Sequence, residues 1–281
     1  MEKILVTGAN GQLGSELFFL SAKYSQFEWI FADRKKIALD NLEALKKQLR
    51  EIQPDIIFNC GAYTAVDKAE SEKDIAFTIN HSAVELIAKY AFENNVKLIH
   101  ISTDYVFDGS SSIALNEEAE TNPINIYGAS KRAGEVACLK ENPNSIIIRT
   151  SWVYSKFGNN FVKTMQRLMQ EKESINVVND QIGSPTYAAD LAQVMLNILE
   201  SSNWIPGIYN YSNEGEISWY EFALCIKEFG GYSCNIGGIP SMSYPTPARR
   251  PKFSLLDKKK IKTIYNLDIP NYKESLRKMF I

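Results

Sequence analysis

Histidine and cysteine, the residues that most often hold zinc in proteins, are scarce in this 281-residue chain. The only histidines are His81 and His100. The four cysteines show no close pairing of the kind found in zinc sites: Cys60, Cys138, Cys225 and Cys234. No protein-built metal site is therefore expected. Without a secretory signal, these cysteines predict reduced thiols in a cytoplasmic protein.

Long apolar runs and a strong excess of one charge are also missing. No stretch approaches the roughly 18 apolar residues that a membrane-spanning helix needs, so no membrane association is expected. The 31 lysines and arginines nearly balance the 33 aspartates and glutamates, for a formal net charge of -2. This balance argues against a protein that binds nucleic acid through its overall charge.

Short runs rich in isoleucine and valine alternate with helical patterns through the first half of the chain. The expected strands are residues 3–7, 28–32, 55–59, 97–102 and 145–150. The expected helices between them are residues 11–22, 42–52, 74–94 and 127–140. Continuous apolar strands of this kind are typical of a parallel sheet covered by helices on both faces. The predicted fold class is therefore α/β, with a Rossmann-type doubly wound parallel sheet.

The regular alternation of strands and helices ends after Arg149. Helices are expected there at residues 160–170, 188–199 and 218–229. We predict a NAD(P)-binding Rossmann domain over residues 1–152, to which the chain returns within about 176–212. Residues 153–281 are then expected to form mainly a smaller C-terminal α/β substrate domain.

A glycine-rich turn follows the first expected strand and opens the first helix. Gly8, Gly11 and Gly14 give the spacing G-x-x-G-x-x-G, and the residues between them, Asn10, Gln12 and Leu13, are expected beside the same ligand. Glycine lets the backbone approach a pyrophosphate, and a helix N-terminus offers it unpaired N–H groups. The turn therefore predicts a dinucleotide site.

Two adjacent residues at the end of the second strand favour different cofactors. Asp33 lies where an acidic side chain bonds the adenosine ribose and favours NAD. Arg34 follows at once, and an arginine there can pair with a 2′-phosphate and favour NADP. The sequence therefore leaves NADPH and NADH both open.

Tyr127 and Lys131 lie four residues apart, a spacing that places both side chains on one helix face. A cation about 4 Å from a phenol is worth roughly 4 kcal/mol at an effective dielectric of 20, which predicts a lowered tyrosine pKa. Thr103 ends the fourth strand after Ser102, at the edge where doubly wound sheets bind ligands, and its hydroxyl can hold a carbonyl oxygen. Together these residues predict reduction of a ketone by hydride.

These motifs resemble the extended short-chain dehydrogenases/reductases and, within them, the dTDP-4-dehydrorhamnose reductase family. Six segments carry the resemblance, in the order and spacing of that family: residues 61–70 (GAYTAVDKAE), 102–109, 127–135, 149–154, 180–186 and 248–257. They extend it over nearly the whole chain. The resemblance implies NAD(P)H-dependent reduction of the C4 ketone of dTDP-4-dehydro-L-rhamnose to dTDP-L-rhamnose, used for bacterial surface polysaccharides.

The resemblance also implies roles for individual residues. Tyr127 would donate the proton, Lys131 would hold the nicotinamide ribose, and Thr103 would bind the ketone oxygen. Residues on the cofactor side would further include Asp40, Asn41, Gly61, Ala62, Tyr63 and Ser102. Residues on the sugar side would be Thr103, Asp104, Tyr105 and Trp152, with Arg250 at the substrate diphosphate. The pair Cys60-Gly61 departs from the alanines usual in the family and should affect packing more than chemistry.

Other functions remain as alternatives. A sugar-nucleotide 4,6-dehydratase would carry Asp-Glu after the threonine, because elimination needs a further acid and base, whereas here Tyr105 follows Asp104. Reduction of another 4-keto sugar nucleotide stays open. So does a non-catalytic nucleotide-binding protein resembling the regulatory subunit of methionine adenosyltransferase.

The resemblance leaves assembly open as well. Some family members dimerise around Mg²⁺ held by acidic side chains, and Glu16 matches one such position. A glutamate on a helix surface is the alternative interpretation. A homodimer and Mg²⁺ binding are therefore possible, and neither is predicted by the residues themselves.

Overall fold

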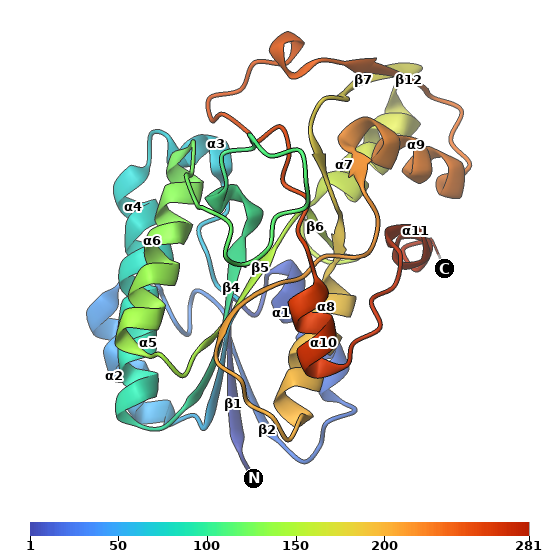
Figure 1. The fold of residues 1–281 in the computed structure, drawn as a ribbon. Coiled ribbons are helices and arrows are strands. Elements are labelled where there is room, and N and C mark those ends of the chain that lie inside the picture. Colours follow the sequence, from blue (N-terminus) through green and yellow to red (C-terminus); the bar gives the residue numbers. More distant parts are fainter. Residues whose placement is uncertain (281) are drawn as a thin grey trace.

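The computed structural model, which describes residues 1–280, has a six-stranded parallel sheet at its centre (Figure 1). In spatial order its strands are β10 (Gly207–Asn210), β5 (Ile146–Thr150), β4 (Lys97–Thr103), β3 (Ile56–Asn59), β1 (Lys3–Thr7) and β2 (Glu28–Ala32). The strand order reverses between β1 and β3. In open α/β sheets such a reversal places the ligand crevice at the carboxyl ends of the two strands.

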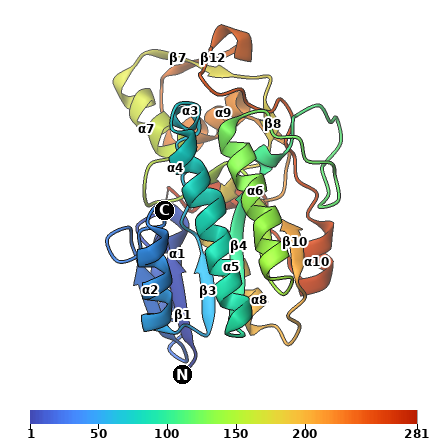
Figure 2. The same ribbon diagram turned by 90° about the vertical axis from the view of Figure 1, so that its left-hand side faces the viewer.

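Helices cover both faces of the sheet, because alternate strand residues point to opposite sides. Ile4 and Val6 of β1 pack towards α1 (Gln12–Ser21) and α8 (Ala188–Glu200). Leu5, between them, packs towards α2 (Leu42–Ile52) and α5 (Ala83–Glu93) on the other face. Figure 2 looks onto α2, α5 and α6 (Ile126–Glu141) with the sheet behind them. The doubly wound, Rossmann-type fold is confirmed.

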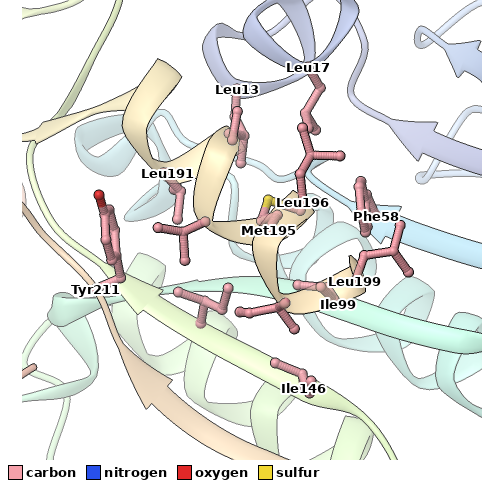
Figure 3. Close-up of a cluster of buried hydrophobic side chains, with 14 of the residues drawn as sticks. Leu13, Leu17, Phe58, Ile99, Ile146, Leu191, Met195, Leu196, Leu199 and Tyr211 are labelled. Carbon is pink, nitrogen blue, oxygen red and sulfur yellow. The ribbon is translucent and has the colours of Figure 1, made fainter. Parts of the chain in front are cut away.

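The helix α8 fills the space between α1 and the sheet (Figure 3). Its Leu191, Met195 and Leu196 are completely buried, and they meet Leu17 of α1 and Ile146 of β5. Burying one such side chain contributes about 1.5–3 kcal/mol, so α8 fixes the position of α1 on the sheet. The glycine turn at the start of α1 is held in place by this packing.

Most of the remaining elements form smaller units above the carboxyl edge of the sheet, whereas α10 (Lys259–Tyr265) lies beside β10 (Figure 1). The strands pair as β7 (Ser174–Val178) with β12 (Asn235–Ile239), β6 (Val153–Tyr154) with β9 (Thr186–Tyr187), and β8 (Ile182–Gly183) with β11 (Ile217–Ser218). The helical elements are α7 (Phe161–Glu171), α9 (Trp219–Gly230), η3 (Ser241–Ser243), α10 (Lys259–Tyr265) and α11 (Tyr272–Arg277). A separate apolar cluster that includes Phe222 and Tyr154 joins α7, α9 and α11.

The chain between the two parts returns to the sheet, where β10 pairs with β5 in parallel. The assignment of residues 1–152 to cofactor and 153–281 mainly to substrate stays a prediction about roles. No helix among the described residues is long and apolar enough to cross a membrane.

The expected strands and helices are found within a few residues of their predicted bounds, with one local exception. The single helix expected over residues 74–94 is divided into α4 (Lys73–Phe77), a π-helical turn η1 (Thr78–Ser82) and α5. Two short elements were not expected: α3 (Val66–Ala69) and the 3-10 turn η2 (Asp104–Val106). All three irregular elements adjoin the carboxyl edge of the sheet or α6, where the candidate residues lie.

Candidate active site

A cavity of about 840 Å³ opens at the carboxyl edge of the sheet. It brings together most of the residues that the sequence singled out: Gly8, Asn10, Gly11, Gln12, Leu13, Gly14, Asp33, Arg34, Asp40, Gly61, Ala62, Tyr63, Ser102, Thr103, Asp104, Tyr105, Tyr127, Lys131 and Trp152. Asn41 and Arg250 are not among its lining residues. One cavity of this size can hold a dinucleotide and a second ligand beside it.

The glycine turn forms one end of the cavity. Gly8 has φ +66°, a conformation that favours glycine, and a Cβ there would come within 2.7 Å of the Gly61 backbone. A Cβ on Gly14 would come within 2.4 Å of the Gly8 carbonyl oxygen. The glycines therefore let β1, the loop after β3 and α1 meet closely. The residues present fit a nucleotide pyrophosphate.

The N-terminus of α1 faces this cradle. Gly11 is its N-cap and has no side chain to satisfy the first N–H groups, while Gln12 and Leu13 line the cavity. An uncapped helix N-terminus offers N–H donors and a partial positive charge to an anion.

At the end of the cavity beside β2, Asp33 already accepts hydrogen bonds from its own loop and from Asn10. Its Oδ1 accepts the backbone N–H groups of Lys35 and Lys36, and its Oδ2 accepts a hydrogen bond from Asn10 Nδ2 at 3.2 Å. The backbone bonds hold the pKa of this carboxyl below its usual value. Arg34 is largely exposed and pairs with Asp40 at 2.6 Å, so a cation also stands at this rim. Asp33, which favours NAD, and Arg34, which favours NADP, therefore lie at the same end of the cavity.

Asn41 has a structural role at the start of α2, and its place on the cofactor side stays a prediction of the resemblance. Its side chain caps α2 by accepting the N–H of Ala44 at 3.0 Å, and it lies outside the cavity lining. A capping asparagine at a helix start is common.

Thr103 and Asp104 form a hydrogen-bonded pair at the end of β4. The Thr103 hydroxyl donates to Asp104 Oδ1 at 3.0 Å and accepts the N–H of Tyr105 at 3.2 Å. Burial raises the pKa of Asp104 to about 6. Its second oxygen, Oδ2, is buried and accepts no hydrogen bond of good geometry from the described residues, although the nearby Ser254 hydroxyl acts to lower the pKa of this carboxyl. Because Asp104 lines the cavity, this carboxylate can accept a bond from a ligand hydroxyl.

Tyr127 lies in the first turn of α6, and its ring meets that of Tyr105 edge to face at 5.6 Å. The prediction of an acidic phenol is wrong for the protein without ligands: burial raises the pKa of Tyr127 to about 12, although Thr103 acts in the opposite direction. The phenol is therefore neutral at physiological pH.

The position of Lys131 explains why the pKa of Tyr127 is not lowered as the sequence predicted. Its Nζ donates to the backbone carbonyl of Ile101 at 2.6 Å, and the side chain is 2% exposed. Burial lowers the pKa of Lys131 to about 8, and the carboxylate of Glu135 partly opposes this shift. The ammonium is thus directed at β4, and two of its three N–H groups are left for other partners.

A buried ion pair lies behind these residues. Arg149 of β5 donates from Nε and Nη2 to the two oxygens of Glu135 on α6, at 2.8 Å each. Ser102 of β4 donates its hydroxyl to Glu135 Oε1 at 2.6 Å. Both charged side chains are at most 1% exposed. Glu135 was missed in the sequence, although it continues the Tyr127–Lys131 face four residues further along α6.

Trp219 was also missed. It begins α9, lines the cavity and stacks on Trp152, with ring centroids 3.7 Å apart and planes 12° from parallel. Trp152 has φ +49°, which is rare for a bulky residue and is expected to cost about 1–3 kcal/mol. No pattern in the sequence pointed to Trp219, because it reaches the cavity only through the fold.

Arg250 is bound by Asp67, with Nη2 and Oδ2 at 2.7 Å and Nη1 and Oδ1 at 3.0 Å, and it is not among the lining residues of the cavity, so its role at a diphosphate stays a prediction. The expectation for Glu16 is corrected. Glu16 is not on a helix surface: it is 4% exposed and accepts the Ser155 hydroxyl at 2.6 Å. Burial raises the pKa of Glu16.

The fold and this cavity define a class, the Rossmann-type reductases that pair a glycine cradle with a Thr, Tyr and Lys set. Comparison with known proteins narrows the class. The family model described as RmlD substrate binding domain matches residues 1–281, and the chain belongs to this family, that of the dTDP-4-dehydrorhamnose reductases.

Individual relatives are similar to this chain over nearly their whole length. The dTDP-4-dehydrorhamnose reductase of Sinorhizobium fredii is 40% identical over 99% of this chain and 96% of its own. A crystal structure of the Bacillus anthracis reductase in complex with NADP is 41% identical, with a TM-score of 0.94 over 99% of this chain and 98% of that one. The Clostridium acetobutylicum structure is 37% identical, with the same TM-score and coverage.

The buried ion pair yields a stability prediction. Glu135→Gln removes one charge and leaves Arg149 buried without its counter-ion, which should lower the free energy of unfolding by about 3–5 kcal/mol. Denaturant unfolding measures this loss. The matched control is Glu171→Gln, whose partner Arg167 is 59% exposed; it should change stability by less than about 1 kcal/mol. Equal effects in the two variants would contradict the assigned importance of the buried pair.

Proposed function

We propose that this protein reduces the C4 ketone of dTDP-4-dehydro-L-rhamnose to dTDP-L-rhamnose with NADPH or NADH. The main support for this proposal is that Thr103, Tyr127 and Lys131 line the same cavity as the glycine-rich turn. The names of the relatives support the substrate. Bound NADP in the Bacillus anthracis relative supports a nicotinamide cofactor.

The glycine cradle and the N-terminus of α1 would hold the cofactor pyrophosphate, with Gly61, Ala62 and Tyr63 along its length. When bound, the reduced cofactor supplies the hydride for C4. Lys131 has two N–H groups beyond the one given to Ile101, and these are available to the ribose hydroxyls. Its charge also favours a negative oxygen on a neighbouring phenol.

Thr103 and Asp104 would exchange partners when the sugar binds. The Thr103 proton turns from Asp104 Oδ1 to the ketone oxygen, where negative charge develops during reduction. Asp104 can accept a sugar hydroxyl in return, which satisfies its buried oxygen. Tyr127 then transfers its proton to the C4 oxygen. The high pKa of Tyr127 keeps that proton in place until the alkoxide forms.

Trp152 and Trp219 would supply the apolar wall of the sugar pocket. Their stacked rings present a rigid surface, and flat apolar surfaces suit the C–H groups and the methyl of a 6-deoxy sugar. Arg250 would reach a substrate diphosphate only by exchanging its bond to Asp67, so that assignment depends on rearrangement.

The alternatives have less support. An elimination reaction lacks the glutamate that would follow Asp104. A non-catalytic binding protein has no need for the Thr103, Tyr127 and Lys131 set, which this chain retains in one cavity. Glu16 faces Ser155, so the proposal assigns no role to Mg²⁺, and a homodimer stays a prediction of the family resemblance.

The direct test is cofactor oxidation followed by absorbance. NADPH and NADH are assayed side by side with dTDP-4-dehydrorhamnose and with a second 4-keto sugar nucleotide, next to a known reductase. We expect substrate-dependent loss of reduced cofactor with dTDP-4-dehydrorhamnose. No loss under conditions where the known reductase is active would refute the proposed function, and a clear preference for the other sugar would redirect the substrate assignment.

Tyr127→Phe tests the proton donor. Removing the phenol hydroxyl should lower kcat at least about 100-fold, the usual scale of general acid catalysis, while the Kd for NADPH stays within a few-fold. Turnover and fluorescence titration of bound NADPH measure the two quantities. Tyr90→Phe, on α5 and outside the cavity lining, is the control and should retain most turnover. Unchanged kcat in Tyr127→Phe would disprove the assigned role.

The pH dependence of turnover should reflect Lys131. Its pKa of about 8 means that the ammonium loses its charge as pH rises through that value, so kcat/KM should fall on the alkaline side near pH 8. Tyr127, at about 12, cannot produce a fall in this range. In Lys131→Arg the side chain stays charged and the residual activity should show no such fall. A fall near pH 8 that persists in this variant would assign it to another group.

A further inference from the structure

The loop of residues 155–160, between β6 and α7, passes over the start of α1. Residues 156–159 in its middle are exposed, and two of them, Gly158 and Asn159, line the cavity. Gly158 has φ +62°, and a Cβ there would lie 3.1 Å from Gln12 Cγ. The loop therefore approaches the first residue of α1 closely, beside the cradle that fits a nucleotide pyrophosphate.

The side chain of Gln12 contacts the chain on both sides of this loop. Its Nε2 donates to the carbonyl of Val153 at 3.2 Å, and its Oε1 accepts a hydrogen bond from Asn160 Nδ2 at 3.0 Å. Only an amide can both donate and accept in this way from one planar group. Because Gln12 is the first residue of α1, its backbone N–H is available to an anion while its side chain holds the loop.

Asn160 has two separate roles. Its Oδ1 accepts the N–H of Lys163 at 3.1 Å and caps α7. Its Nδ2 donates to Gln12 and, at 2.8 Å, to the carbonyl of Ser155. The bond to Oδ1 belongs to the helix, whereas the bonds from Nδ2 order the loop and join it to α1. A substitution that keeps an acceptor at this position and removes the amide donor therefore separates the two roles.

A second contact with α1 lies one helical turn beyond Gln12. Ser155 is completely buried and donates its hydroxyl to Glu16 Oε1 at 2.6 Å. The same hydroxyl accepts the N–H of Phe157 at 2.9 Å. Gln12 and Glu16 are four residues apart and share one face of the helix. The loop is thus attached to α1 at both of its ends, and its middle reaches the cavity.

We propose that the 155–160 loop is a second wall of the cofactor diphosphate site, and that Gln12 and Asn160 are the positioning residues that hold this wall in place. The glycine-rich turn supplies one side of the site, and Gly158 and Asn159 supply the other. While the bridge between Gln12 and Asn160 is intact, the loop slows the release of a bound dinucleotide. The inference rests on the proposed function for the identity of this ligand.

Asn160→Ser tests the bridge, because serine still caps a helix but is too short to reach Gln12. We expect the dissociation rate of NADPH, measured by stopped-flow fluorescence, to rise about ten-fold, the effect of one lost hydrogen bond. NADH should be released faster by the same factor, because both cofactors contain the diphosphate. The matched control is Asn271→Ser, at the cap of α11 and outside the cavity lining, which should change the rate less than about two-fold.

A double-mutant cycle shows whether the two residues act as one bridge. Gln12→Met removes the amide but keeps the length of the side chain and the backbone N–H. The variant with both substitutions should release NADPH about as fast as the faster single variant, because each substitution breaks the same bond. Two independent contacts with the cofactor would instead multiply, to about 100-fold. A role in fold stability alone would leave the release rate of the folded molecules unchanged.

The outcomes are distinct. An unchanged release rate in Asn160→Ser, an equal effect in Asn271→Ser, or rates that multiply in the double variant would each overturn the proposal. Release is measured without the sugar, so a protein that binds NADPH but does not turn over the sugar nucleotide refutes the proposed function alone. A protein that binds neither NADPH nor NADH would overturn both.

Discussion

The buried ion pair between Glu135 and Arg149 determines how the catalytic helix lies on the sheet. Replacing a buried ion pair by apolar residues is often neutral or stabilising, so its presence is better explained by specificity of placement than by net stability. Ser102 of β4 and Arg149 of β5 donate three bonds to Glu135 and so tie α6 to two strands of the sheet, while Arg132 of the same helix adds a fourth. Lys131 and Tyr127, one and two turns earlier, take their positions from it.

The same carboxylate acts on the charge state of the site. Lys131 is buried beneath the cavity, and burial alone favours its neutral form. Glu135 opposes this effect, so that the pKa of Lys131 stays at about 8 and the ammonium is largely protonated at neutral pH. A residue that never reaches the cavity thereby keeps a cation within it. The Glu135–Arg149 pair therefore positions α6, and its carboxylate also keeps Lys131 charged.

The sequence predicted those features that depend on local pattern. Strand and helix periodicity located the sheet, and the glycine spacing and the ends of β1 and β4 located the cavity, because these follow from chain order in a doubly wound fold. Features that depend on a distant partner were not predictable. Asp67 binds Arg250, and Ser155 covers Glu16.

The expectation of an acidic phenol failed for a physical reason that bears on the mechanism. Spacing along a helix places Tyr127 and Lys131 on one face, but Nζ is directed to the Ile101 carbonyl, and burial raises the pKa of the phenol. For reduction this is favourable. The donor must keep its proton until the C4 oxygen becomes an alkoxide, which is a stronger base than a phenolate. Lys131 then contributes most after the proton has left, when a phenolate lies beside it, and interactions that strengthen along the reaction are the ones that lower its barrier.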